Sequence, residues 1–261
     1  GQERRRRSPM LPLSLFGRGD FSGANLLTLL LYAALGGGLY FFPLNLIQVQ
    51  GYSATAAGAA LLPFILILFA LSRWAGQLVD KVGARLPLVL GPAIAGAGFA
   101  LFAVPGTSAS YWAGFFPAVV VLGLGMAITI APLTTTVMNA VGTEAAGLAS
   151  GVNNAVSRVA AVLAIAVFGL LMAWAFDARL DAGLRQLSAP KEVVDFMAGQ
   201  RTRLAEAALP PGIEGAAAEA LREQIRAAYV AGFRWIMLAS AGLALLSALS
   251  AWVAIGRGQG K

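Results

Sequence analysis

Cysteine and histidine are both absent from this sequence of 261 residues. Their absence excludes disulfide bonds, thiol chemistry, histidine-based catalysis and structural zinc sites. Charge is also scarce, because Asp, Glu, Lys and Arg make up 12% of the residues, against roughly 25% in soluble domains. No nucleophile paired with a base and no metal-binding cluster can be assembled from the remaining residue types. We therefore expect neither a soluble domain nor an enzyme, with no catalytic residue, metal or organic cofactor.

Apolar residues dominate instead, at 58% of the chain, with a mean hydropathy of +0.75. An apolar run of about 18 residues or more is long enough to cross a bilayer as a helix. Such runs occur six times, at residues 24–48, 55–78, 87–104, 112–137, 148–176 and 229–255. They are rich in Gly and Ala, which is typical of helices that pack closely in lipid. The sequence therefore predicts an all-α, polytopic membrane protein with six transmembrane helices.

Basic residues outnumber acidic ones, for a net charge of +7, and they are unevenly distributed. If the six runs alternate in direction, the basic residues of segments 1–23, 76–85 and 257–261 fall on one side of the membrane. The short connections on the other side, 50–54 and 105–110, carry no charge. By the positive-inside rule, both chain ends are then cytoplasmic. The basic residues do not gather with aromatics on one face, so nucleic acid is not an expected partner.

Residues 177–228 interrupt the apolar pattern with charges of both signs and a helical composition. The segment falls on the outer side, where long connections translocate with little regard to charge. It is either a solvated helical hairpin that caps the outer face or a docking site for a partner. The expected organisation is a cytoplasmic basic linker (1–23), five transmembrane helices (24–176), an extracytoplasmic helical loop (177–228), a last transmembrane helix (229–256) and a cytoplasmic tail (257–261).

An arginine and two asparagines lie inside the fifth apolar run. Arg158 follows the start of this run by about ten residues, or about 15 Å at helical rise. A charge at that depth faces the protein interior or a water-filled cavity. Arg158 is therefore a cavity-lining residue or ion-pair partner, or else a structural residue that binds helix-end carbonyls or snorkels to the surface. Asn153 and Asn154 either line the same cavity or join neighbouring helices by hydrogen bonds.

Carboxylates are missing from all six apolar runs. Asp20, Asp80, Glu144 and Asp177 all lie at the ends of runs or in the connections between them. A proton-driven carrier needs a titratable group inside the membrane. If the protein is such a carrier, we expect its proton-binding carboxylate outside this chain.

The turn between the second and third runs reads GQLVDKVGAR and combines Gly76, Asp80, Lys81, Gly83 and Arg85. A tight turn explains Gly83, and the inside charge bias explains Lys81 and Arg85, but neither explains Asp80. The pattern resembles the cytoplasmic signature loop of the major facilitator superfamily, which follows the second helix of each six-helix half. The resemblance implies that the loop is a conformational latch, which holds the two halves together on the cytoplasmic side when the carrier faces outward.

Longer stretches, 12–63, 123–134 and 147–160, resemble the C-terminal half of the 14-span drug:proton antiporters of the EmrB/QacA type. An echo of AAGAA (56–60) by AAGLA (145–149), in helices of opposite direction, favours the three-plus-three inverted repeat of such a half. The resemblance implies a bacterial inner-membrane pump that exports hydrophobic, often cationic small molecules by alternating access. The proton gradient is its energy source. Implied partners are a missing N-terminal half, the lipid bilayer and, in Gram-negative members, a periplasmic adaptor and an outer-membrane channel.

Aromatic and sulfur side chains add candidates for a substrate cavity. Tyr32, Phe41 and Phe42 in the first run and Met126 in the fourth supply adaptable apolar contacts for flat hydrophobic cargo. We expect them to join Arg158 and its asparagine neighbours in the cavity. The alternative for each is plain helix packing.

Other functions fit parts of the pattern. A carrier for one specific metabolite would use the same fold. The membrane domain of an ATP-driven transporter would need long cytoplasmic extensions, whereas the long connection here is on the outer side, and the sequence contains no GxxxxGK[ST] motif. A non-transporting scaffold would have no need of Arg158 in mid-membrane.

Overall fold

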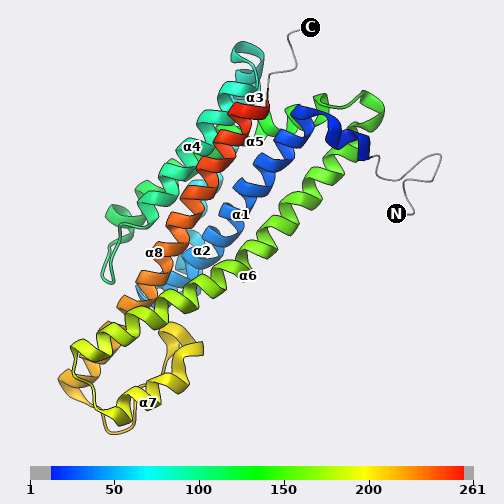
Figure 1. Ribbon diagram of the computed structural model, residues 1–261. Helices are drawn as coiled ribbons and strands as arrows, with labels where there is room; N and C mark the ends of the chain where they lie inside the picture. The colour runs from blue at the N-terminus through cyan, green and yellow to red at the C-terminus, as the bar shows by residue number, and fades with distance from the viewer. Residues whose placement is uncertain (1–12, 256–261) are drawn as a thin grey trace.

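The computed structural model describes residues 13–255, with the side chains of Leu13, Ser14, Asp80 and Glu144 left outside the description. This part of the chain is a bundle of helices (Figure 1). The helices are α1 (Gly19–Gln48), α2 (Ala54–Ala59), α3 (Leu62–Val82), α4 (Arg85–Phe102), α5 (Phe116–Asn139), α6 (Ala146–Gln186), α7 (Lys191–Gln200) and α8 (Gly215–Ala254). A π-helical turn, Tyr111–Phe115, leads into α5, and a 3-10 segment, Arg201–Glu206, follows α7.

The predicted all-α membrane fold is confirmed. Six helical segments of the described chain are long and apolar enough to cross a bilayer, and the second of them is α2 and α3 together. The helix breaks between α2 and α3 because Pro63, which has no N–H to donate, stands in the first turn of α3. At the break the Tyr111 hydroxyl donates to the carbonyl of Ala60 at 2.8 Å. The three-plus-three inverted repeat stays a prediction.

The two ends of the bundle differ in what they carry (Figure 1). The start of α1, the α3–α4 turn and the finish of α8 lie at one end, which we call the turn end. α7 lies at the opposite end, which we call the cap end. An even number of crossings explains why the described chain begins and finishes at the same end, as the sequence predicts.

Helices α6 and α8 are longer than the apolar runs that they contain. They have 41 and 40 residues, or about 60 Å each at helical rise, twice the ~30 Å of a hydrocarbon core. The boundaries predicted at 176 and 229 are therefore not helix ends, because α6 continues to Gln186 and α8 begins at Gly215. Hydropathy marks where a chain leaves lipid, and a helix of polar composition simply continues into water.

Three of the five exposed tryptophans lie on the cap side of the spanning segments. Trp112 lies at the start of the fourth spanning segment, while Trp174 on α6 and Trp235 on α8 stack edge-on with their ring centroids 6.1 Å apart. Exposed Trp side chains favour the level of the lipid headgroups. We therefore expect the parts of α6 and α8 beyond this pair, together with α7, to lie outside the membrane, and we call them the cap.

Polar contacts hold the cap together and fix it to the bundle. Arg201 forms ion pairs with Asp177 and Asp181 at the far end of α6. Gln48, at the end of α1, donates to a Glu206 carboxylate oxygen at 3.0 Å. The segment 177–228 is therefore a packed cap rather than a loose connection, while its role in docking a partner stays a prediction.

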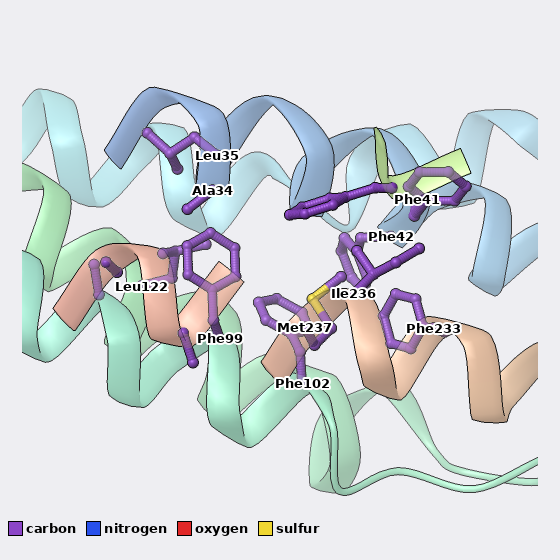
Figure 2. Close-up of a cluster of buried hydrophobic side chains, with 14 of the residues drawn as sticks. Ala34, Leu35, Phe41, Phe42, Phe99, Phe102, Leu122, Phe233, Ile236 and Met237 are labelled. Carbon is purple, nitrogen blue, oxygen red and sulfur yellow. The ribbon is translucent and has the colours of Figure 1, made fainter. Parts of the chain in front are cut away.

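The core lies where α1, α4, α5 and α8 meet (Figure 2). Aromatic rings fill it, and the ring of Phe42 in α1 packs at a tilt against that of Phe102 in α4, with centroids 4.8 Å apart. Glycines let α4 and α5 approach closely, since a Cβ at Gly98 would lie 2.6 Å from the main-chain nitrogen of Leu122. The buried side chains of Figure 2 include Ala34, Leu35, Phe41, Phe42, Phe99, Phe102, Leu122, Phe233, Ile236 and Met237.

Candidate functional site

Two of the spanning segments are much less covered than the others. In its most apolar window, the α2–α3 segment has 11% of its residues buried and α6 has 33%, against 44% to 50% in the other four. Large apolar side chains are exposed on both, with Phe69 of α3 at 81% and Leu170 of α6 at 75%. α3 packs mainly on α5, and α6 packs mainly on α1 and α8, so these two helices flank the bundle.

The exposed face of α6 carries Arg158 and Asn154. The two residues are one helical turn apart, so they lie on the same side of the helix. Arg158 is twelve positions beyond Ala146, the first residue of α6, or about 18 Å at helical rise. No hydrogen bond or ion pair between described residues involves the Arg158 guanidinium or the Asn154 amide group. A cation and an amide are therefore presented at mid-membrane depth on an open face.

Asn153 points the other way and joins α6 to α1. Its Nδ2 donates to Oδ1 of Asn25 at 3.2 Å and to Oγ1 of Thr28 at 2.7 Å. Asn25 and Thr28 are buried and donate in turn to the carbonyls of Phe21 and Ala24. The structure thus favours the helix-joining interpretation for Asn153.

Replacing Asn153 with alanine should loosen the α1–α6 contact. Hydrogen bonds between helices in a membrane contribute about 0.6 kcal/mol each, so we expect a loss of about 1 kcal/mol and a lower melting temperature in detergent. Asn154→Ala is the matched control, because the neighbouring amide is exposed, and it should melt like the unmodified protein. Equal melting of all three proteins would contradict the structural role.

A small polar recess lies beside these residues, where α1, α5 and α6 meet. Its volume is about 110 Å³. Tyr32, Asn153 and Asn154 line it, so the structure brings these three predicted cavity residues together. The other lining residues are Leu133, Thr134, Val137, Met138, Ser150 and Ser157.

The remaining cavity candidates are packed in the core. Phe42 is fully buried, while Phe41 and Met126 are 5% and 1% exposed. None of the three lines the recess. In this conformation they serve helix packing, which was the alternative for each, and their contact with cargo stays a prediction.

The signature turn has the predicted backbone. Gly83 terminates α3 at φ +74°, a conformation that side-chain-bearing residues rarely adopt, and its N–H donates to the Val79 carbonyl. Gly76 and Lys81 are exposed on α3. Asp80 lies in the last turn of α3, and its side chain lies outside the described part of the structure.

Arginines tie the turn end together in a way that the sequence did not predict. Arg85 opens α4, and its Nη2 donates to the Trp252 carbonyl near the end of α8 at 2.7 Å. Arg18 precedes α1, and its Nη1 donates to the Ala140 carbonyl just after α5 at 2.9 Å. Carbonyl groups at the end of a helix have no hydrogen-bond donor within the helix, and these guanidinium groups donate to them instead. Each arginine binds a carbonyl more than 100 positions away in the chain, and the sequence around the arginine gives no indication of such a distant partner.

A larger cavity adjoins the signature turn. It measures about 470 Å³ and lies between the ends of α1, α3, α4 and α5. Asp20 and Arg85 give it charge of both signs. The rest of the lining consists of Val79, Gly83, Ala84, Thr135, Thr136, Asn139, Ala140 and Ile255.

Comparison with known proteins identifies the family. The sequence profile of the Major Facilitator Superfamily matches residues 1–165, more than half of the chain. The chain belongs to the major facilitator superfamily. Members of this superfamily are membrane transporters, and the six helices and the signature turn are features that this chain shares with them.

Curated superfamily relatives carry names from drug resistance. Over 186 residues, 70% of this chain, it is 31% identical to the "Multidrug resistance protein Stp" of Mycobacterium tuberculosis. It is 26% identical over 260 residues to the "Tetracenomycin C resistance and export protein" of Streptomyces glaucescens, and 30% identical over 217 residues to the "Methyl viologen resistance protein SmvA" of Salmonella typhimurium. These matches cover 95% and 81% of this chain. The chain spans 34%, 46% and 41% of the three relatives' lengths.

Proposed function

We propose that this chain is the C-terminal half of a secondary active drug exporter, which works by alternating access and is driven by protons. A second six-helix half, supplied by the rest of the protein, would pack against α3 and α6. The substrate would bind between the halves, in contact with the face that carries Asn154 and Arg158.

The exposed position of Arg158 carries this proposal. A charged side chain facing hydrocarbon at the centre of a helix costs about 2.5–3.5 kcal/mol or more. Arg158 therefore needs protein or water opposite it, yet the described helices leave it uncovered. A second six-helix bundle would place protein opposite Arg158, and a water-filled cavity between the two halves would hydrate its guanidinium group. The low burial of α3 and α6 supports the same arrangement.

The relatives support drugs as the cargo, because their names refer to resistance and export. Proton coupling rests on the resemblance to drug:proton antiporters. Since no carboxylate lies in the apolar runs, the proton-binding group would belong to the other half. The turn end would face the cytoplasm of a bacterial cell, because Arg18, Lys81 and Arg85 gather there. The periplasmic adaptor and the outer-membrane channel are likewise proposals, for which the cap offers a folded surface.

Transport by the full-length protein tests the proposal. The protein is reconstituted in liposomes, a pH gradient is imposed, and the movement of a hydrophobic dye is recorded by fluorescence. We expect uptake that requires the gradient and stops when an ionophore collapses it. Residues 1–261 alone should show no transport, because the substrate site would lie between two halves. A full-length protein that inserts correctly but moves no compound in response to the gradient would contradict the proposed function.

A further inference from the structure

The recess between α1, α5 and α6 has the size of a functional group rather than of a whole drug. Its volume of about 110 Å³ compares with about 30 Å³ for one water molecule in the liquid. It therefore suits a carboxylate or a similar group with its hydration, while an apolar skeleton would extend along the exposed face of α6. That face changes from polar to apolar along its length, from Asn154 and Arg158 to Val162 and Leu170.

Several hydrogen-bond donors around the recess are already used within the bundle. Asn153 gives its amide hydrogens to α1, the Thr134 hydroxyl donates to the Ile130 carbonyl, and the Ser157 hydroxyl donates to the Asn154 carbonyl. Within the described chain, the Asn154 amide and the Arg158 guanidinium have no such partner. An amide offers two N–H donors and a guanidinium offers five. Asn154 at the recess and Arg158 one turn beyond it therefore offer unused hydrogen-bond donors, and Arg158 adds a positive charge.

Among the side chains that the structure describes, no carboxylate pairs with Arg158. From residue 21 to residue 176 the sequence contains two carboxylates, Asp80 and Glu144. Asp80 is in the last turn of α3 and Glu144 directly precedes α6, so both belong to the turn end. Arg73 of α3, the second flanking helix, is also exposed and adds positive charge. Arg158 is thus a cation on the open face of α6 that has no hydrogen bond or ion pair to another described side chain.

We infer that Arg158 and Asn154 form a subsite for an anionic group of the cargo, such as a carboxylate or phenolate, and that this half selects against permanent cations. The inference rests on the proposed export function and narrows its substrate class. A guanidinium forms two parallel hydrogen bonds with a carboxylate, and such charge-assisted bonds are roughly twice as strong as neutral ones. In a cavity poor in water, the unpaired cation also repels a cationic ligand more strongly than it would in bulk solvent.

Two dyes with the same skeleton and opposite charge test the inference. Fluorescein is anionic in mildly alkaline buffer, and rhodamine 123 is a cation on the same xanthene rings. Binding of each dye to the purified full-length protein is followed by fluorescence anisotropy, and transport of each is followed in liposomes. We expect tighter binding of fluorescein. Arg158→Ala should weaken fluorescein binding about tenfold or more and, because it removes a like charge, strengthen rhodamine 123 binding.

Further variants separate charge from structure. Arg158→Lys should restore part of the fluorescein affinity, since a lysine keeps the charge but loses the planar pair of donors. Arg158→Glu should reverse the preference between the two dyes. Asn154→Asp leaves the arginine in place but sets a carboxylate one turn away, so it should also weaken fluorescein binding. Arg203→Ala removes an exposed arginine of the cap and is the matched control, with no expected effect on either dye.

Several outcomes would overturn the inference. Equal weakening of both dyes by Arg158→Ala would mean that the arginine only shapes the protein or pairs with an acid of the other half. Unchanged binding of both dyes, or a native protein that prefers rhodamine 123, would exclude an anion subsite. Failure of the proposed export function would give a different result. The protein would still bind fluorescein through Arg158, but a pH gradient would drive transport of neither dye.

Discussion

Replacing Gly125 with alanine should lower the stability of the bundle more than the addition of a single methyl group elsewhere in these helices. A Cβ at Gly125 would lie 2.7 Å from the carbonyl oxygen of Gly91 and closer still to the main-chain nitrogen of Ala95. Main-chain atoms within a helix cannot rotate away as a side chain does, so α4 and α5 would have to separate. Added methyl groups in a well-packed interior typically cost 1–3 kcal/mol, and we expect about 3 kcal/mol here. The measurement is the melting temperature in detergent, with monodispersity on gel filtration.

Gly169→Ala is the matched control for this prediction. Gly169 also lies inside a long helix, α6, but no atom beyond that helix's own backbone lies within 4 Å of the position of its added Cβ. Alanine favours helix by up to about 1 kcal/mol over glycine, so this variant should melt at the same temperature or slightly higher. Similar destabilisation by both substitutions would show that close helix approach at Gly125 is not what stabilises the bundle.

Replacing Asp80 with asparagine should impair transport while leaving membrane insertion intact. Asparagine has nearly the same shape and remains compatible with the turn, but it removes the negative charge that the latch hypothesis requires. In the hypothesised latch, the Asp80 carboxylate would face a helix N-terminus of the other half, and such an interaction contributes about 0.3–1 kcal/mol or more when it is partly buried. A loss near the upper value shifts the balance between outward-facing and inward-facing states about fivefold. We therefore expect transport to fall at least about fivefold in liposomes, at equal amounts of inserted protein.

Gln77→Ala supplies the control for the Asp80 variant. Gln77 is exposed, stands one turn before Asp80 and is not part of the signature pattern. It should transport and insert like the unmodified protein. If Asp80→Asn lowered insertion and transport in the same proportion, the aspartate would be a structural element of the turn rather than one half of a latch.

For the neighbouring residues Asn153 and Asn154, the sequence predicted the two possible roles but not which residue has which. Asn153 and Asn154 were predicted together, as cavity residues or as links between helices. In the structure Asn153 links α6 to α1 and Asn154 is exposed beside Arg158. Successive residues of an α-helix point about 100° apart, so two adjacent asparagines cannot both face the same neighbour. Their division of roles depends on where α1 lies, and the local sequence of α6 does not contain that information.

The sequence by itself determined the number of membrane crossings, the asymmetry of charge and the glycine turn after α3. These properties follow from the solvation of individual residues in lipid and from the backbone freedom of Gly83, and both act locally. Only the tertiary structure decided that Phe42 and Met126 are core and that Arg158 is uncovered. It also decided that α6 and α8 continue beyond the membrane into a cap. These features depend on which helices pack against each other, and that choice rests on contacts between residues far apart in the chain, such as the close approach of α4 and α5 at Gly125.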